Sequence, residues 1–95
     1  MEIRIIVDIE AMGGFGKKLE ARLISLANES TKEVGCIEYN LHKDTKNSDR
    51  FFIYEIWKSK AHLEKHNSTM HFKHFIEGSN GTIAHIKIHF VETIN

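Results

Sequence analysis

The chain has 95 residues, with 13 basic and 13 acidic side chains and no net charge at neutral pH. This length suits one compact domain, which we assign to residues 1–95. Because no block of like charge appears, the sequence gives no electrostatic surface for a nucleic acid or an anionic membrane. A domain this small buries a limited share of its surface, so a second subunit is a natural source of further burial.

Cysteine usage and the N-terminus point to the cytoplasm. Cys36 is the only cysteine and cannot form an internal disulfide. The first ten residues, MEIRIIVDIE, carry charges through their apolar part and so resemble neither a signal peptide nor a membrane span. We therefore expect a cytoplasmic protein whose partner is a small neutral or aromatic molecule.

The first third of the chain predicts a strand followed by a helix. Apolar and polar residues alternate over Ile3–Glu10, which predicts a strand that ends before the turn-forming Gly13. From Phe15 the apolar residues recur at helical spacing, and this pattern predicts a helix that runs to about Glu33 and stops near Gly35.

Two further strands are predicted on either side of the polar turn DTKNSD. In the first, CIEYNLHK, alternation places Ile37, Tyr39 and Leu41 on one face and Cys36 and Glu38 on the other. The second, RFFIYEIW, is apolar on both faces, which indicates layers packed against both sides of the strand. Its two faces are Phe51, Ile53 and Trp57 on one side and Phe52, Tyr54 and Ile56 on the other.

The last third predicts two short helices and a final strand. Ser59 is a good N-cap for a helix that begins at Lys60, and Thr69 is a good N-cap for a helix that ends at Gly78. The run IAHIKIHFVE then alternates as a strand.

The element order β, α, β, β, α, β predicts an α+β fold of the ferredoxin-like, split β-α-β type. In this fold an antiparallel four-stranded sheet carries its helices on one face. Because the strand from Arg50 to Lys58 is apolar on both faces, we expect its uncovered face to meet a second subunit. The expected assembly is a two-fold homodimer whose sheets pack face to face, a dimeric α+β barrel.

Four of the seven histidines lie in the stretch AHLEKHNSTMHFKHF. His66 falls in an apolar stripe with Leu63 and Met70, so we expect it to face inward, either as a core histidine bonded to a carbonyl or as a catalytic base. His62 is expected at the wet edge of this stripe.

The other two histidines of this stretch belong to the following helix. His71 borders the apolar face that Phe72, Phe75 and Ile76 form, whereas His74 points away from that face.

A metal site on these histidines is not expected. His62 and His66 have the i, i+4 spacing of zinc ligands, but the nearby acidic residue is Glu64 and does not directly follow the first histidine. A third ligand is also missing from the pattern.

Glu55 is unusual because it lies between Ile53 and Trp57 on a strand expected to be buried on both sides. A carboxylate there needs a partner or has its pKa raised. Two interpretations remain open, a salt bridge to a basic residue such as Arg4 and a direct role in chemistry. Trp57 and Tyr39 fit either the core or the walls of an aromatic pocket.

The segments GCIEY, FFIYEIW and AHLEKHNSTMHFKHF together resemble the antibiotic biosynthesis monooxygenase domain, a family of small dimeric α+β barrel proteins. The resemblance extends over roughly Ile3–Ile76. The residues that carry it, in order and at family-like spacing, are Gly35, Cys36, Tyr39, Glu55, Trp57, His66, Thr69, His71 and Phe72.

The resemblance implies three kinds of activity. Members include cofactor-free oxygenases of quinols and polycyclic phenols, isomerase-like enzymes acting on a phosphorylated signal, and haem-degrading enzymes. The haem-degrading branch is expected to have an asparagine in the first strand, a tryptophan in the helix and a histidine further along. Here these positions hold Val7, His66 and Ile76, so haem degradation is disfavoured.

For the oxygenase branch, the resemblance implies His66 as the catalytic base, Glu55 as an orienting or polarising group, and Trp57 and Tyr39 as apolar walls. His71 is assigned to substrate binding by the same resemblance. No cofactor is expected, because a deprotonated phenol or quinol reduces dioxygen directly. The run GGFG also lacks the spacing and the lysine of a phosphate-binding loop. An isomerase of the same fold and a non-catalytic binding dimer remain as alternatives.

Overall fold

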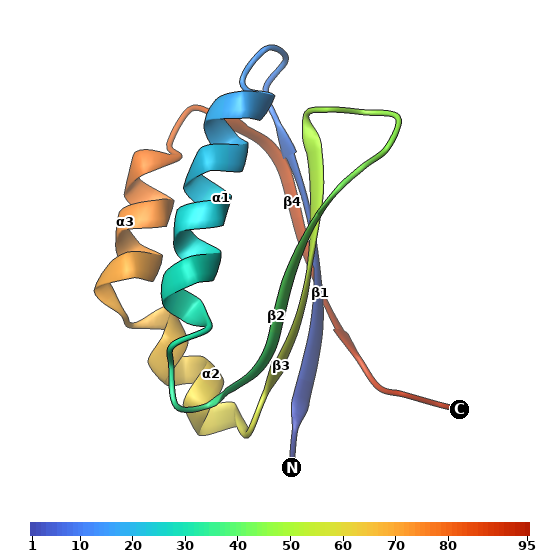
Figure 1. The fold of residues 1–95 in the computed structure, drawn as a ribbon, viewed down its shortest axis with the longest axis vertical. Helices are drawn as coiled ribbons and strands as arrows, with labels where there is room; N and C mark the ends of the chain where they lie inside the picture. Colours follow the sequence, from blue (N-terminus) through green and yellow to red (C-terminus); the bar gives the residue numbers. More distant parts are fainter.

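The computed structural model describes residues 1–95 and contains one four-stranded antiparallel sheet with three helices. The elements are β1 (Ile3–Ala11), α1 (Gly16–Ser30), β2 (Cys36–Lys43), β3 (Arg50–Trp57), α2 (Lys60–Asn67), α3 (Met70–Gly78) and β4 (Ile83–Val91). The sheet has the order β2-β3-β1-β4, and all helices lie on one of its faces (Figure 1). The predicted ferredoxin-like α+β fold is therefore confirmed.

Helix α1 is shorter at both ends than the periodicity predicts. It begins at Gly16, where an added Cβ would overlap Asp49 and Ser48, while Phe15 is the N-cap residue and stays exposed. It ends at Ser30, after which residues 31–35 form a turn. Glu33 consequently lies in the turn and not on the helix.

Strand β2 begins with a bulge that reverses the expected faces of its first residues. Cys36 pairs with Trp57 but Glu38 pairs with Ile56, so one residue of β2 is left over between them. That residue is Ile37, which is exposed, while Cys36 packs against the core. The prediction that Ile37 shares a face with Tyr39 and Leu41, opposite to Cys36, is wrong, because a bulge shifts the alternation by one residue.

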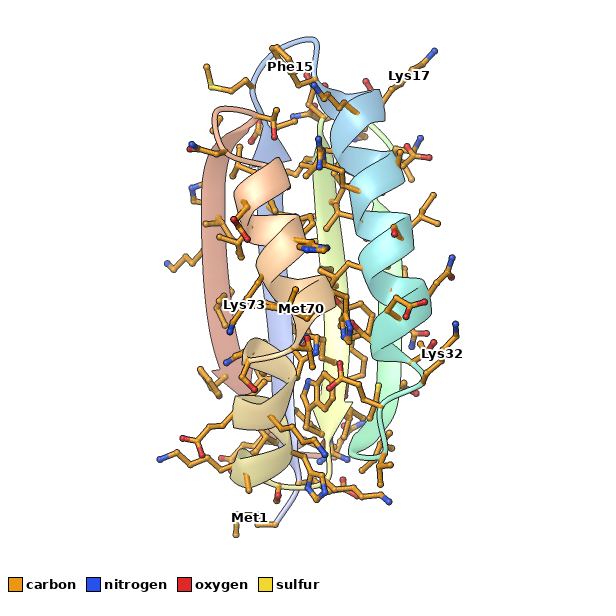
Figure 2. All side chains as sticks on the ribbon, turned by 90° about the vertical axis from the view of Figure 1, so that its left-hand side faces the viewer. Met1, Phe15, Lys17, Lys32, Met70 and Lys73 are labelled. Atoms are coloured by element: carbon orange, nitrogen blue, oxygen red, sulfur yellow. The ribbon has the colours of Figure 1, made fainter.

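Helices α2 and α3 have the predicted caps. The Ser59 hydroxyl accepts a hydrogen bond from the His62 N–H, and the Thr69 hydroxyl accepts one from the Phe72 N–H. Met70, which the helical spacing places in the apolar stripe, is exposed instead, because the chain ends one helix and starts another between positions 67 and 70. Figure 2 looks onto the helices, where α1 and α3 lie side by side over the sheet.

The core lies between the helices and the sheet. Phe51, Ile53 and Trp57 of β3 face it, as predicted, together with Ile5 and Ile9 of β1. On the opposite face of β3, Phe52 and Tyr54 are half-buried although no helix covers them. None of the helices is long and apolar enough to cross a membrane.

Candidate functional site

An apolar cavity of about 260 Å³ lies between the sheet and helices α1, α2 and α3. Three polar side chains reach it, those of Glu55, His66 and Asn67. The other lining residues are Ile5, Val7, Ile9, Leu23, Leu26, Tyr39, Ile53, Leu63, Phe72, Phe75, Ile76, Ile86, Ile88 and Phe90. A mostly apolar cavity with a few polar groups is typical of a small-molecule site.

Strand β4 contributes three exposed apolar residues to the lining of the cavity. Ile86, Ile88 and Phe90 pair with Ile9, Val7 and Ile5 of β1 and therefore belong to the face that the helices cover. They are nevertheless 48%, 55% and 68% exposed. An apolar ligand could enter along this strand and bury these side chains.

His66 lies at the end of α2, and its side chain points into the protein, as the apolar stripe predicts. The residue is 2% exposed, and its Nδ1 lies 2.6 Å from Oε2 of Glu33. The partner is thus a carboxylate and not the expected carbonyl. Burial lowers the pKa of His66, and the neighbouring Glu33 opposes this effect.

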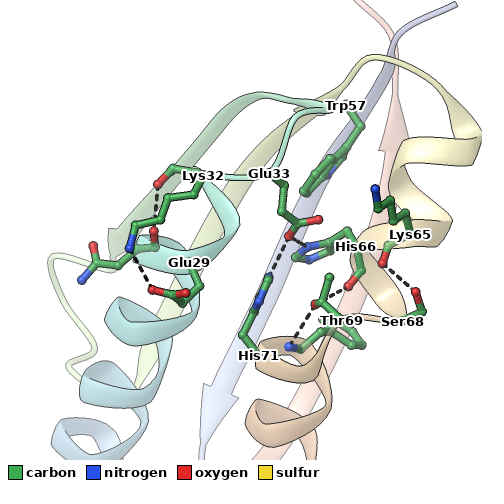
Figure 3. Close-up of polar contacts among 12 residues, drawn as sticks. Glu29, Lys32, Glu33, Trp57, Lys65, His66, Ser68, Thr69 and His71 are labelled. Carbon is green, nitrogen blue, oxygen red and sulfur yellow. Dashed lines mark hydrogen bonds and ion pairs between the residues drawn. The ribbon is translucent and has the colours of Figure 1, made fainter.

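Glu33 also binds His71. The Nε2 atom of His71 lies 2.8 Å from the same oxygen, Oε2 of Glu33, so one carboxylate oxygen accepts hydrogen bonds from both imidazoles. Figure 3 shows Glu33 between the two rings. The three donor atoms lie within 4.8 Å of one another and are a group that could hold a metal ion.

Glu55 has a hydrogen bond to Trp57 and no salt bridge. The indole Nε1 of Trp57 donates to Oε1 of Glu55 over 2.9 Å. Burial raises the pKa of Glu55 to about 7, although this hydrogen bond lowers it. The suggested salt bridge to Arg4 does not form, because Arg4 pairs with Ile56 in the sheet, points to the other face and binds Glu2.

Tyr39 and Trp57 occupy different places relative to the cavity. Tyr39 lines it and pairs with Glu55 across the sheet, and burial raises the pKa of its hydroxyl. Trp57 is fully buried and does not line the cavity, in contrast to the expected wall position. The ring centroids of Trp57 and His66 lie 4.4 Å apart, so the indole packs against the imidazole.

His71 also lies outside the cavity. It lines a separate groove of about 270 Å³ between α1 and α3, together with Arg22, Ser25, Glu29 and His74. The predicted site residues therefore divide into Tyr39, Glu55 and His66 on the cavity wall, and Trp57 and His71 behind it.

Glu33 is the site residue that sequence reasoning missed. The helical pattern places it at the end of a helix, with no sign of a special partner. Its two histidine partners follow 33 and 38 residues later in the chain. No residue spacing within a single helix or strand predicts a contact between residues so far apart in the chain.

Comparison with known proteins agrees with this fold. Residues 2–78 match the model of the family described as "Antibiotic biosynthesis monooxygenase". The chain belongs to this family of small α+β proteins.

Solved structures show the same architecture. The crystal structure of PA3566 from Pseudomonas aeruginosa is 33% identical, with a TM-score of 0.95 over 99% of this chain and 95% of that one. Protein SO0527 from Shewanella oneidensis is 20% identical and shares the fold, with a TM-score of 0.89 over 95% of this chain and 88% of that one.

Relatives are also found among curated sequences. An uncharacterized protein of Synechocystis sp., sll1783, is 35% identical over 55 residues, or 58% of this chain and 37% of its own length. The protein YcnE of Bacillus subtilis is 35% identical over 52 residues, or 55% of each chain. The chain therefore covers about half or less of the length of these two relatives.

Proposed function

We propose that the protein is a cofactor-independent monooxygenase that oxidises a quinol-like or polyphenolic small molecule with dioxygen. One observation carries the proposal. His66 is buried at the wall of an apolar cavity, and its Nδ1 is held by Glu33, which leaves Nε2 as the nitrogen that can accept a proton.

The surroundings of His66 suit a base. Nδ1 donates to the Glu33 carboxylate, which fixes the tautomer and stabilises the imidazolium that forms when Nε2 takes a proton. Trp57 packs against the ring and restricts its orientation. Glu55 lines the same cavity, and in this proposal it orients or polarises the oxygen of a bound phenol.

The reaction is balanced without a further reductant. His66 takes a proton from an acidic C–H or O–H of the substrate, and the resulting carbanion or phenolate transfers one electron to dioxygen. The substrate radical and superoxide combine at carbon to form a peroxide. At a carbon that carried two hydrogens, the peroxide regains the proton from His66 and loses water. One oxygen atom stays as a carbonyl, and the other leaves in the water.

The apolar lining contributes to this chemistry by excluding water from the anion and the peroxide. It also favours an uncharged ligand over a phosphorylated one. None of the residues that line the cavity is a lysine or an arginine, whereas a phosphate group is normally bound by such cations. The isomerase alternative has no comparable support.

The test is oxygen uptake by chelator-treated protein with a panel of quinols and anthrones. We expect turnover in the wild type and a loss of about a hundredfold or more in His66→Gln. His74→Gln is the matched control, because His74 is exposed and lies outside the cavity, so turnover should persist. Saturable binding of these compounds without oxygen uptake would instead identify a non-catalytic binding protein.

The functional unit in this proposal is a homodimer. Phe52, Tyr54 and Ile56 lie on the sheet face that the helices leave uncovered. A second copy packed face to face on this surface would bury them and supplement the small core.

A further inference from the structure

We propose that Glu33, His66 and His71 form a binding site for a divalent transition-metal ion of the Zn²⁺ class, and that this ion inhibits the enzyme. The inhibitory part depends on the proposed function, in which His66 is the base. The binding part stands independently of it.

The three side chains come from three different segments and converge on one point. Glu33 lies in the turn after α1, His66 at the end of α2 and His71 in the first turn of α3. The side chains of Glu33 and His66 are 15% and 3% exposed and that of His71 is 24% exposed, so an ion could reach the cluster from the groove that His71 lines.

The donor set suits the ion. Two imidazole nitrogens and one carboxylate oxygen are a ligand set found in catalytic zinc sites, where the fourth position is left to water. The donors are already within 4.8 Å of one another. Bonds of about 2.0–2.2 Å to each donor require the donors to lie roughly 3–3.5 Å apart. Oε2 of Glu33 now lies at hydrogen-bond distance from both histidine nitrogens. To bind the ion it would have to move away from them by a few tenths of an ångström or slightly more.

Charge also favours the ion. With both histidines neutral, the cluster holds one carboxylate charge away from bulk water, and a divalent cation would be stabilised by it. Of the two histidines with zinc-like spacing in the sequence, only His66 belongs to this site, whereas the Nδ1 atom of His62 lies 2.7 Å from the Ser59 hydroxyl.

The inhibitory effect follows from the tautomer of His66. In the hydrogen-bonded state, Nδ1 carries the proton and Nε2 is free to accept another. When Nδ1 binds a metal, the ring proton of the neutral imidazole must be on Nε2. Nε2 then carries this proton and no longer acts as a base. The ion would thus inactivate His66 without occupying the cavity.

The direct test is titration of the chelator-treated full-length protein with Co²⁺, followed by the visible absorption of tetrahedral Co²⁺, and with Zn²⁺ by calorimetry. We expect one ion per chain in the wild type and binding at least about tenfold weaker in His71→Gln and Glu33→Gln. The controls His62→Gln and His74→Gln should bind as the wild type does. Circular dichroism verifies that each variant is folded. If Glu33→Gln unfolds, His71→Gln still tests the site, because His71 is partly exposed.

Absence of saturable binding to the wild type, or unchanged binding in His71→Gln, would overturn the site.

A separate measurement tests inhibition. Zn²⁺ should abolish oxygen uptake, EDTA should restore it, and uptake by His71→Gln should resist Zn²⁺. If no compound supports oxygen uptake, the proposed function and the inhibitory role fail, while the Co²⁺ titration still decides whether the site exists. If uptake occurs and Zn²⁺ leaves it unchanged at saturation, the inhibitory role is wrong.

Discussion

The indole of Trp57 lies against the imidazole of His66, with ring centroids 4.4 Å apart and planes inclined by 33°. The same indole donates its N–H to Glu55. One buried tryptophan therefore orients two of the three polar side chains that line the cavity, although it does not line the cavity itself.

Replacement of Trp57 by phenylalanine tests this link. The variant removes the hydrogen bond that lowers the pKa of Glu55, so we expect that pKa to rise above its value of about 7. The lost bond and the smaller ring should cost about 2 kcal/mol of unfolding free energy. Carbon-13 NMR titration and urea denaturation measure the two effects. Phe52→Leu, on the opposite face of β3, should leave the Glu55 titration unchanged.

Glu55 should make the protein less stable as the pH rises. Its pKa is about 7 in the folded protein against 4.5 for a free side chain. Because the pKa of Glu55 is higher in the folded than in the unfolded protein, the contribution of this residue to stability is complete below about pH 4.5 and is lost as the pH rises through 7. At about 1.4 kcal/mol per pH unit, the loss amounts to roughly 3 kcal/mol at most.

Glu55→Gln should remove this dependence, because the amide oxygen still accepts the bond from Trp57 but carries no charge. The difference in unfolding free energy between pH 5 and pH 8 is the quantity to measure, by urea denaturation of both proteins. Parallel pH profiles for the wild type and the variant would show that Glu55 is not the group responsible.

The uncovered face of the sheet predicts the oligomeric state. We expect the wild type to sediment as a dimer and Tyr54→Glu to sediment as a monomer, because the variant places a charge in the middle of the proposed interface. Ile24→Glu is the control, since Ile24 is exposed on α1 and lies away from this face. A wild-type protein that is monomeric at micromolar concentration would contradict the dimer.

Gly35 should be intolerant of any side chain. A Cβ at this position would overlap the Cβ and ring of His62, which lies in the first turn of α2. We expect Gly35→Ala to lower the unfolding free energy by about 1–3 kcal/mol as α2 is displaced. Gly13 has open space around it and an ordinary backbone conformation, so Gly13→Ala should change stability by less than about 0.5 kcal/mol. Equal effects of the two variants would refute the close packing of Gly35 against α2.

The sequence alone was sufficient for the architecture. The alternation of Ile5, Val7 and Ile9, the helical spacing of Leu19 and Leu23, and the caps at Ser59 and Thr69 together specify the elements and their order. These patterns arise from contacts between residues two to four positions apart, so they are visible in a linear chain.

The inward position of His66 was also predictable, because it depends on the phase of one helix. Its role could be inferred only by adding the family resemblance carried by Tyr39, Glu55, Trp57 and the histidines. The bulge at Ile37 was not predictable, since the sequence contains no marker for an extra residue in a strand.

Only the tertiary structure revealed how the polar groups are connected. Glu33 meets His66 and His71 because the turn after α1 packs against the junction of α2 and α3. Trp57 and His71 both lie outside the cavity lining. Contacts between residues more than thirty positions apart depend on how whole elements pack, and no periodicity within one element encodes that arrangement.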